Sequence, residues 1–271
     1  MGRTILITGA TDGIGLQTAV HLAEMGHDLI LHGRNLQRLS DAHKRATDAG
    51  APSVTTVQAD FSDLHQVRNM AQTIGEHFET IDVLINNAGV YLNERRVTPD
   101  GFEMTLTVNH IAPFVLTHAL LSHIEGAEQG RIVNVSSVAH TRGYLNRQDI
   151  HLETGYDGYT AYAQSKLANV LFTRALARRL EATAVTVNAL HPGVVATKML
   201  KDGFGMQKGR HSHDEGAATS IRLATDDSLA AVTGAYFSVN VRKDPARQAT
   251  DRDAEEWLYQ WTAEVTGTTP R

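Results

Sequence analysis

The sequence predicts an α/β fold in which a doubly wound parallel sheet carries helices on both faces. Short apolar runs alternate with longer amphipathic runs along the 271 residues. The short runs are nearly all apolar, which is typical of strands covered on both faces. Strands that alternate with helices pair in parallel through right-handed crossovers. No repeat, low-complexity segment or linker divides the chain, so one domain over residues 1–271 is expected.

Each element has its own pattern. The apolar runs predict about seven strands, at residues 5–7, 28–32, 54–58, 81–85, 130–135, 185–190 and 235–239. Helical periodicity predicts helices at 13–25, 36–47 and 64–78, a long one following Val108, and one around Tyr162. The amphipathic stretch 253–265 forms either a helix packed on the domain or a partner surface. The segments 141–158 and 198–214 are irregular and follow strand ends, where ligand loops of such sheets lie.

Composition narrows the function. With 42% hydrophobic and 20% charged residues, the chain has the makeup of a globular protein. A net charge of −5 argues against nucleic acid, and the absence of cysteine excludes disulfides, thiolate catalysis and cysteine-ligated metals. The start lacks a signal-peptide pattern, and no run reaches the ~18–20 apolar residues of a membrane span. We therefore expect a cytoplasmic protein without a membrane span.

A glycine-rich turn follows the first predicted strand. Gly9, Gly13 and Gly15 are spaced Gly-x-x-x-Gly-x-Gly and run into a helix, with Thr11, Asp12 and Ile14 between them. Glycines at such a turn let the backbone approach a pyrophosphate at a helix N-terminus. A purely structural turn is the alternative. The position directly after strand one favours a dinucleotide.

The end of the second strand selects between the two nicotinamide cofactors. A carboxylate there would hold the ribose 2′-hydroxyl and repel a 2′-phosphate. This chain instead has His32, Gly33, Arg34 and Asn35. Arg34 offers a fork of donors suited to a phosphate, although it can also be a solvated residue at a helix start. We predict NADP(H), with NAD(H) as the less favoured cofactor.

Tyr162 and Lys166 lie four residues apart in a run with helical periodicity. That spacing places them on one helix face, about one turn or roughly 6 Å apart along the axis. Alone, the pair also fits a surface lysine beside a half-buried tyrosine. Further motifs change this interpretation.

Three of these motifs appear in order: Asn86–Gly89 ends the fourth strand, Asn109 begins a helix, and Ser136 and Ser137 end the fifth strand. With the glycine turn and the Tyr162/Lys166 pair, they make the whole chain resemble the short-chain dehydrogenase/reductase family, whose fold is Rossmann-like. The segments 131–140, 162–173 and 191–195 resemble its retinol-dehydrogenase-like branch in particular. Many animal members of that branch carry a membrane anchor; this chain is expected to be a soluble relative.

The resemblance implies residue roles. Tyr162 matches the catalytic acid/base, and Lys166, Ser137 and Asn109 match the other members of the family's tetrad. The implied cofactor contacts extend beyond the glycine turn and Arg34. They include Asp60 and Phe61 near adenine, Asn87, Ala88 and Gly89 beneath the ribose, and Pro192, Gly193, Val195 and Thr197 near the nicotinamide carboxamide, together with Tyr162 and Lys166. The resemblance also implies homo-oligomers built through the long helices.

The chemistry needs these residue types. Hydride transfer to a carbonyl carbon leaves an oxygen that must be protonated, and a phenol can supply the proton. A lysine ammonium one turn away is expected to lower the phenol's ordinary pKa of about 10. Ser137 is expected to donate a hydrogen bond to the substrate oxygen, and Asn109 to hold a water that relays protons. Despite 14 histidines, no metal is expected, since His211 and His213 form the only tight pair.

The substrate is expected to be a hydrophobic aldehyde, ketone or alcohol. Apolar residues occur in the loops at the presumed carboxyl edge, where they form a lid or ordinary loop anchors: Tyr91, Leu92, Tyr144, Leu145, Met199, Leu200, Phe204 and Met206. A non-catalytic NADP(H)-binding sensor or scaffold is the alternative class, but such proteins usually lose a tetrad residue. A sugar-nucleotide epimerase would need a longer C-terminal substrate domain and a different glycine spacing.

Overall fold

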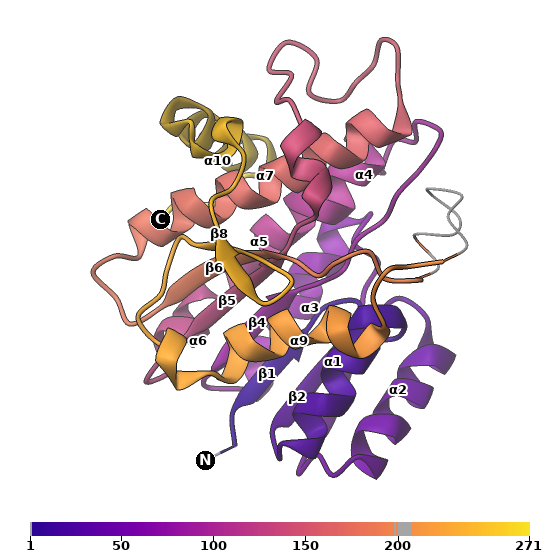
Figure 1. Ribbon diagram of the computed structural model, residues 1–271, viewed down its shortest axis with the longest axis vertical. Helices are drawn as coiled ribbons and strands as arrows, with labels where there is room; N and C mark the ends of the chain where they lie inside the picture. The colour runs from indigo at the N-terminus through magenta and orange to yellow at the C-terminus, as the bar shows by residue number, and fades with distance from the viewer. Residues whose placement is uncertain (1, 198, 200–207) are drawn as a thin grey trace.

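The computed structural model describes residues 2–197, 199 and 208–271, and an eight-stranded sheet forms its centre (Figure 1). The strand order is β3-β2-β1-β4-β5-β6-β7-β8. All neighbours pair in parallel except β7 and β8, which are antiparallel. The strands are β1 Thr4–Ile7, β2 Asp28–Gly33, β3 Val54–Gln58, β4 Val83–Asn86, β5 Arg131–Val135, β6 Thr186–His191, β7 Tyr236–Ser238 and β8 Val241–Lys243. The predicted doubly wound α/β fold is confirmed.

The eighth strand was not expected from the sequence. β8 has only three residues, all exposed, so it lacks an apolar pattern. It pairs with β7 across Val239 and Asn240, whose φ angles are 47° and 65°. Two left-handed residues form the usual tight hairpin turn, but a β-branched valine is an unusual occupant of one. The strand therefore depends on its turn and on β7 rather than on its own sequence.

The sheet reverses its winding at β1. The chain passes from β1 through β2 to β3 on one side and then crosses back to β4 on the other. In open α/β sheets, the crevice outside the carboxyl ends of the strands at such a reversal is the usual ligand site. The glycine turn after β1 and the Asn87–Gly89 turn after β4 meet at this point.

Alternate strand residues pack on opposite faces of the sheet. Ile5 and Ile7 belong to a core shared with α1, α2 and α9, which lie side by side in Figure 1. Leu6 and Ile30 belong to a larger core shared with α3, α5, α7 and α10. Both faces are thus covered, which explains why the strands read as continuous apolar runs.

The helices begin at side chains that accept hydrogen bonds from their first turns. Such caps satisfy backbone N–H groups that have no partner within the helix. The capping residues are Asp12, Asn35, Asp63, Asp157, Ser212 and Asp251, for α1, α2, α3, α7, α9 and α10 respectively. The helices are α1 Gly13–Glu24, α2 Leu36–Asp48, α3 Leu64–His77, α4 Met104–Leu106, α5 Ala112–Ala119, α6 Leu121–Glu125, α7 Gly158–Arg179, α9 His213–Thr225 and α10 Arg252–Thr266.

The helix predicted to follow Val108 starts earlier. It begins with α4 at Met104, capped by the buried carboxylate of Glu103, and passes through a π-helical stretch, Thr107–Ile111, into α5. The prediction that Asn109 begins a helix is wrong, because Asn109 lies in the middle of that π-helical stretch. No sequence pattern marks such a stretch, but π-helical turns are frequent at functional sites.

The C-terminal helix packs back on the domain, against α7 and α5. The buried carboxylate of Glu255 accepts a hydrogen bond from Arg174 Nε at 2.7 Å and pairs with Arg178, both on α7. The Tyr259 ring packs edge-on against Phe114 of α5. This confirms the first of the two interpretations offered for residues 253–265. Among the described residues, no helix is long and apolar enough to cross a membrane.

Candidate active site

Tyr162 and Lys166 lie on buried turns of α7, facing the end of β5. Only 6% of the surface of Tyr162 and 3% of that of Lys166 is exposed to solvent. Tyr162 shares a hydrogen bond with the side chain of Ser137, the residue that follows β5 and Ser136. Lys166 Nζ lies 5.6 Å from the centre of the Tyr162 ring and donates a hydrogen bond to the carbonyl of Val135 at 2.9 Å. The structure thus brings the three predicted residues together.

Burial dominates the charge states of this pair. It raises the pKa of Tyr162 to about 12, although the hydrogen bond from Ser137 acts in the opposite direction. Burial also lowers the pKa of Lys166 to about 8. The expected lowering of the Tyr162 pKa is therefore not what this structure gives. The phenol stays protonated near neutrality, and the ammonium stands close to its own titration range.

Asn109 braces the turn after β4 against α7. Its Oδ1 accepts a hydrogen bond from Val90 N at 2.7 Å, and its Nδ2 donates to Val90 O at 3.0 Å. Nδ2 also donates to Ser165 Oγ at 2.9 Å, and Ser165 Oγ donates to Tyr162 O. Both ends of the amide are engaged, so the side chain fixes the distance between this turn and α7.

Gly89 lets that turn close on the tetrad. A Cβ atom at Gly89 would lie 3.2 Å from Asn109 Oδ1 and 3.4 Å from Lys166 Nζ. Ser136 supports the same arrangement, because its Oγ donates to Lys166 O at 2.7 Å. This contact ties the end of β5 to α7.

The glycine turn forms a cradle without room for side chains. A Cβ atom at Gly15 would lie 2.3 Å from Gly9 O and 2.4 Å from Asn87 Nδ2. Gly9 and Gly13 have φ angles of 64° and 52°, a region that favours glycine. A Cβ atom at Gly13 would lie 3.3 Å from Thr197 Cγ2, which brings the segment after β6 against the turn.

The turn after β4 is fastened to the glycine cradle. Asn87 Nδ2 donates to Thr8 O at 2.8 Å and Gly9 O at 3.1 Å, and the N–H groups of Asn87 and Ala88 donate to Thr8 Oγ1. Residues 9, 87 and 88 therefore form one rigid unit at the point where the sheet reverses. The N-terminus of α1 begins within the glycine turn, and a helix N-terminus there is a common binding site for a pyrophosphate.

These features match one protein family. Residues 3–208 match the short chain dehydrogenase family. The chain belongs to that family. It is 38% identical to human retinol dehydrogenase 13 over 98% of this chain and 85% of the relative. The resemblance to the retinol-dehydrogenase-like branch is thus confirmed, and the chain is an NAD(P)-dependent oxidoreductase of the short chain dehydrogenase type.

Solved structures agree with this fold. A crystal structure of an uncharacterized protein from Mycobacterium Paratuberculosis is 31% identical, covers 99% of this chain and 95% of its own, and superimposes with a TM-score of 0.83. A short chain dehydrogenase from Escherichia coli CFT073, complexed with NADPH, is 26% identical with a TM-score of 0.73 and covers 88% of this chain and 96% of its own.

Two arginines lie near the glycine turn, after β2 and at the start of α2. Arg34 is exposed directly after β2, and Arg38 lies in the first turn of α2. Arg38 Nη1 lies 3.6 Å from Asp12 Oδ2, so α2 is linked to the glycine turn. The sequence interpretation missed Arg38. Its signal was a second cation four residues after Arg34.

His32 is another missed residue. Gly9 N donates to His32 Nδ1 at 3.2 Å, and His32 Nε2 donates to Ala59 O at 3.1 Å. The imidazole thereby joins the glycine turn to the end of β3. It stacks on Phe61 with ring centres 4.3 Å apart, which places the Phe61 side chain in the core. Asp60 lies next to it, and its Oδ1 accepts hydrogen bonds from Ser62.

The segment after β6 passes close to the cradle. Pro192 and Val195 are buried, and Gly193 has a φ angle of 96°. His211 Nδ1 accepts a hydrogen bond from Val194 N at 3.1 Å. His211 therefore holds a turn, and His213 begins α9 rather than lying in a loop. Among the described residues, no group of three or more His, Asp or Glu side chains could hold a metal ion.

The residues proposed as a lid lie in different surroundings. Tyr91 and Met199 pack with Tyr162, and the Tyr91 and Tyr162 ring centres lie 5.5 Å apart. Leu145 is buried in the core, as a loop anchor would be, whereas Tyr144 is 74% exposed. Leu200, Phe204 and Met206, like most of the loop 198–214, lie outside the described residues.

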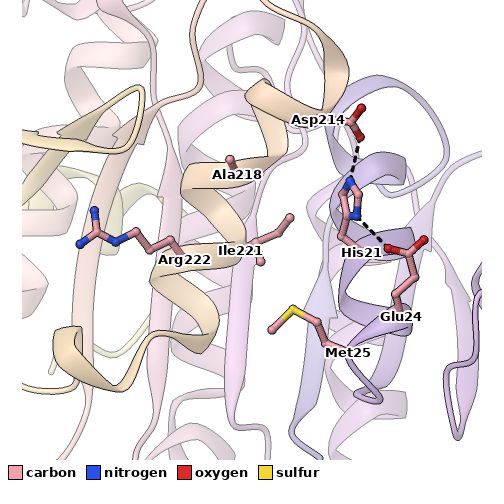
Figure 2. A pocket seen from close by; sticks show the side chains of 7 residues that line it. All are labelled: His21, Glu24, Met25, Asp214, Ala218, Ile221 and Arg222. Atoms are coloured by element: carbon pink, nitrogen blue, oxygen red, sulfur yellow. Dashed lines mark hydrogen bonds and ion pairs between the residues drawn. The ribbon is translucent and has the colours of Figure 1, made fainter.

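A shallow hollow on the surface lies apart from these residues. Figure 2 shows the hollow between α1 and α9, about 400 Å³ in volume, lined by residues that include His21 and Asp214. His21 Nε2 and Asp214 Oδ1 lie 2.7 Å apart, and the Asp214 contact is the largest cause that raises the pKa of His21. This pair ties the start of α9 to α1. None of the tetrad residues lines the hollow.

Proposed function

We propose that this short chain dehydrogenase is an NADP(H)-dependent oxidoreductase that interconverts a hydrophobic aldehyde or ketone and its alcohol, with Tyr162 as general acid/base. The observation that carries the proposal is the hydrogen bond between buried Tyr162 and Ser137, with Lys166 beside the phenol ring. A sensor or scaffold has no need for a buried phenol and ammonium held in this way.

The cradle fits a nicotinamide dinucleotide. A Cβ atom added at Gly15 would collide with Gly9 O, and one added at Gly89 would crowd Asn109 Oδ1. The absence of side chains at these two glycines lets a ligand approach the backbone closely. Arg34 and Arg38 flank the adenosine end, and guanidinium groups bind phosphate with paired hydrogen bonds. NADPH is also bound in the related Escherichia coli structure. These features support NADP(H) over NAD(H).

The surroundings of Tyr162 support an apolar substrate. Tyr91, Met199 and Ala139 pack around the phenol. Val138 and Tyr144 are 50% and 74% exposed, so apolar surface continues from the site to the solvent. The relative retinol dehydrogenase 13 is named for an apolar alcohol. A compound with an apolar body and one carbonyl or hydroxyl group fits this lining.

The chain's own residues supply position, charge and a proton. When bound, NADP(H) supplies or accepts the hydride. Ser137 donates a hydrogen bond to the substrate oxygen and stabilises its developing charge. Tyr162, protonated near neutrality, gives its proton to that oxygen, which suits the reduction direction. Lys166 is the next titratable group and can return a proton to the phenol, while Asn109 holds the turn in place.

The decisive experiment measures oxidation of NADPH and NADH by the purified protein with a panel of aldehydes, ketones and quinones. The Tyr162→Phe variant is expected to bind NADPH normally and to lose turnover by about 10²–10⁴-fold, the usual contribution of a general acid/base. Tyr259→Phe is the control, since it removes another buried phenol that lies between α5 and α10. Near-normal turnover of Tyr162→Phe would exclude the proposed role.

A further inference from the structure

His140 lies between the catalytic serine and a distant part of the chain. It is 1% exposed and belongs to the 3₁₀ helix Val138–Arg142, which Ser137 caps. Its Nδ1 lies 2.7 Å from Ser137 O, and its Nε2 lies 3.1 Å from Ala246 N. Ala246 immediately precedes the 3₁₀ helix Arg247–Thr250. One imidazole therefore spans two segments that are 106 positions apart in the sequence.

The two partners determine the tautomer of this ring. A carbonyl oxygen can only accept a hydrogen bond, so Nδ1 must carry the proton and donate it to Ser137 O. A backbone N–H can only donate, so Nε2 must be the unprotonated acceptor. Burial also lowers the pKa of His140, which favours the same neutral form.

The position of the Ser137 hydroxyl depends on this turn. Ser137 Oγ accepts a hydrogen bond from Ala139 N at 3.2 Å and shares one with Tyr162. Ser137 O accepts from both His140 N at 3.1 Å and His140 Nδ1 at 2.7 Å. The carbonyl and the hydroxyl of one residue are thus held by adjacent groups of the same short helix, so a shift of the carbonyl would move the hydroxyl.

A second side chain fastens the same turn to the same segment. Gln248 Nε2 lies within 3.0–3.4 Å of the carbonyl oxygens of His140, Thr141 and Gly143. These carbonyls lie at the end of the 3₁₀ helix Val138–Arg142. The segment 246–248 therefore provides a fixed point for the turn that carries Ser137.

We propose that His140 is a positioning residue that holds the carbonyl of Ser137 and so keeps the Ser137 hydroxyl aligned with Tyr162. Ala246 anchors the far side of the imidazole, and Gln248 prevents the turn from rotating about it. His140 does not touch the substrate; it acts through Ser137. This inference rests on the proposed oxidoreductase function, which gives the Ser137 hydroxyl its purpose.

Two substitutions of His140 test its hydrogen bond to Ser137 O separately from its hydrogen bond with Ala246 N. The amide nitrogen of asparagine can take the place of Nδ1, and the amide oxygen of glutamine can take the place of Nε2. His140→Asn is expected to keep kcat within about threefold, because the bond to Ser137 O remains. His140→Gln is expected to lower kcat about tenfold or more at an unchanged KM for NADPH, because that bond is lost.

Amide hydrogen exchange gives a readout that does not need turnover. In His140→Gln, exchange of the Ala139 amide is expected to accelerate while the Ala246 amide stays protected. In His140→Asn, the two amides are expected to behave the other way round. If the wild type turns over no carbonyl or alcohol, the proposed function fails, and this exchange pattern still decides whether His140 fixes the Ser137 turn.

His118 provides the matched control. It has the same two-sided contacts, with Nδ1 2.8 Å from Phe114 O and Nε2 2.7 Å from Tyr259 Oη, but it lies on α5. His118→Gln is expected to lower the melting temperature and leave kcat unchanged. Equal losses of kcat in His140→Asn and His140→Gln, in proportion to their melting temperatures, would overturn the proposal. So would full activity of His140→Gln.

Discussion

At the carboxyl ends of β1 and β4, backbone groups shape the site, whereas at the end of β5 side chains from distant segments do. On the first side, Gly9, Gly13 and Gly15 leave space, and Asn87 is fixed by main-chain carbonyls. On the second side, the side chain of Ser137 shares a hydrogen bond with Tyr162, and its carbonyl accepts one from His140. The first arrangement joins two turns 78–79 positions apart through main-chain carbonyls, while the second relies on side-chain contacts of Tyr162 and His140. The cofactor side thus tolerates little added volume, and the substrate side tolerates little loss of hydrogen bonding.

Lys166 stands where the two sides meet, and its replacement gives the largest expected effect. Lys166→Met should lower turnover by about 10²–10⁴-fold, because the proton path to Tyr162 is lost. It should also stabilise the fold near neutral pH, since burial lowers the pKa of Lys166 from 10.5 to about 8 and so penalises the charged form.

The pH dependence of that stabilisation follows from its sign. A lowered lysine pKa means that the unfolded chain binds more protons between about pH 8 and pH 10.5. The cost of burying the charge, on the order of 3 kcal/mol, is complete below that range and disappears as the pH rises through it. Chemical unfolding of Lys166→Met and of the wild type at several pH values measures how their difference in unfolding free energy changes with pH. Lys243→Met, at an exposed lysine of β8, is the control. A difference in stability that does not change with pH would contradict the argument.

Gly15→Ala tests the cofactor side. The added Cβ would lie 2.3 Å from Gly9 O, so the turn must move away from the position that a pyrophosphate needs. A displacement of this size is expected to weaken NADPH binding by about 10–100-fold, as measured by calorimetry. Gly26→Ala is the control, because a Cβ atom added at Gly26 meets no atom within 4 Å. Equal NADPH affinities of the two variants would show that the Cβ atom added at Gly15 does not disturb the cradle.

The smallest effect is expected for the two arginines. Arg34→Ala and Arg38→Ala should each raise the KM for NADPH about tenfold and leave the KM for NADH nearly unchanged, since only NADPH carries the 2′-phosphate. Arg45→Ala, an exposed position in the last turn of α2, should change neither value. An unchanged NADPH/NADH ratio in both Arg34→Ala and Arg38→Ala would refute the NADP(H) preference.

The sequence predicted the elements that carry a strong pattern. Residues 54–58 match the bounds of β3, because β-branched residues between turn residues are a local signal. The eighth strand and the π-helical stretch around Asn109 lack such a signal. Both depend on neighbours: β8 on β7, and the π-helical stretch on the packing of α4 and α5.

The same distinction applies to the site. The glycine turn and the Tyr162/Lys166 pair are short motifs, so they could be recognised, and the structure brings them together. The chemical roles assigned to them stay predictions. The contacts of His140 could not be predicted, because Ala246 lies 106 positions away and contributes only a main-chain N–H. Arg38 was within reach of the sequence, because it is a second cation four residues after Arg34 and lies in the first turn of the predicted helix 36–47.

The packing of α10 on α7 has a consequence for synthesis on the ribosome. Every residue assigned to the site precedes Arg252, where α10 begins. A nascent chain that has not yet reached α10 therefore carries all the predicted site residues. It lacks Glu255, which pairs with Arg174 and Arg178, and Tyr259, which packs against Phe172. Transiently exposed apolar surface makes folding intermediates prone to aggregation. The helix that carries Tyr162 and Lys166 gains these contacts only when α10 has been made.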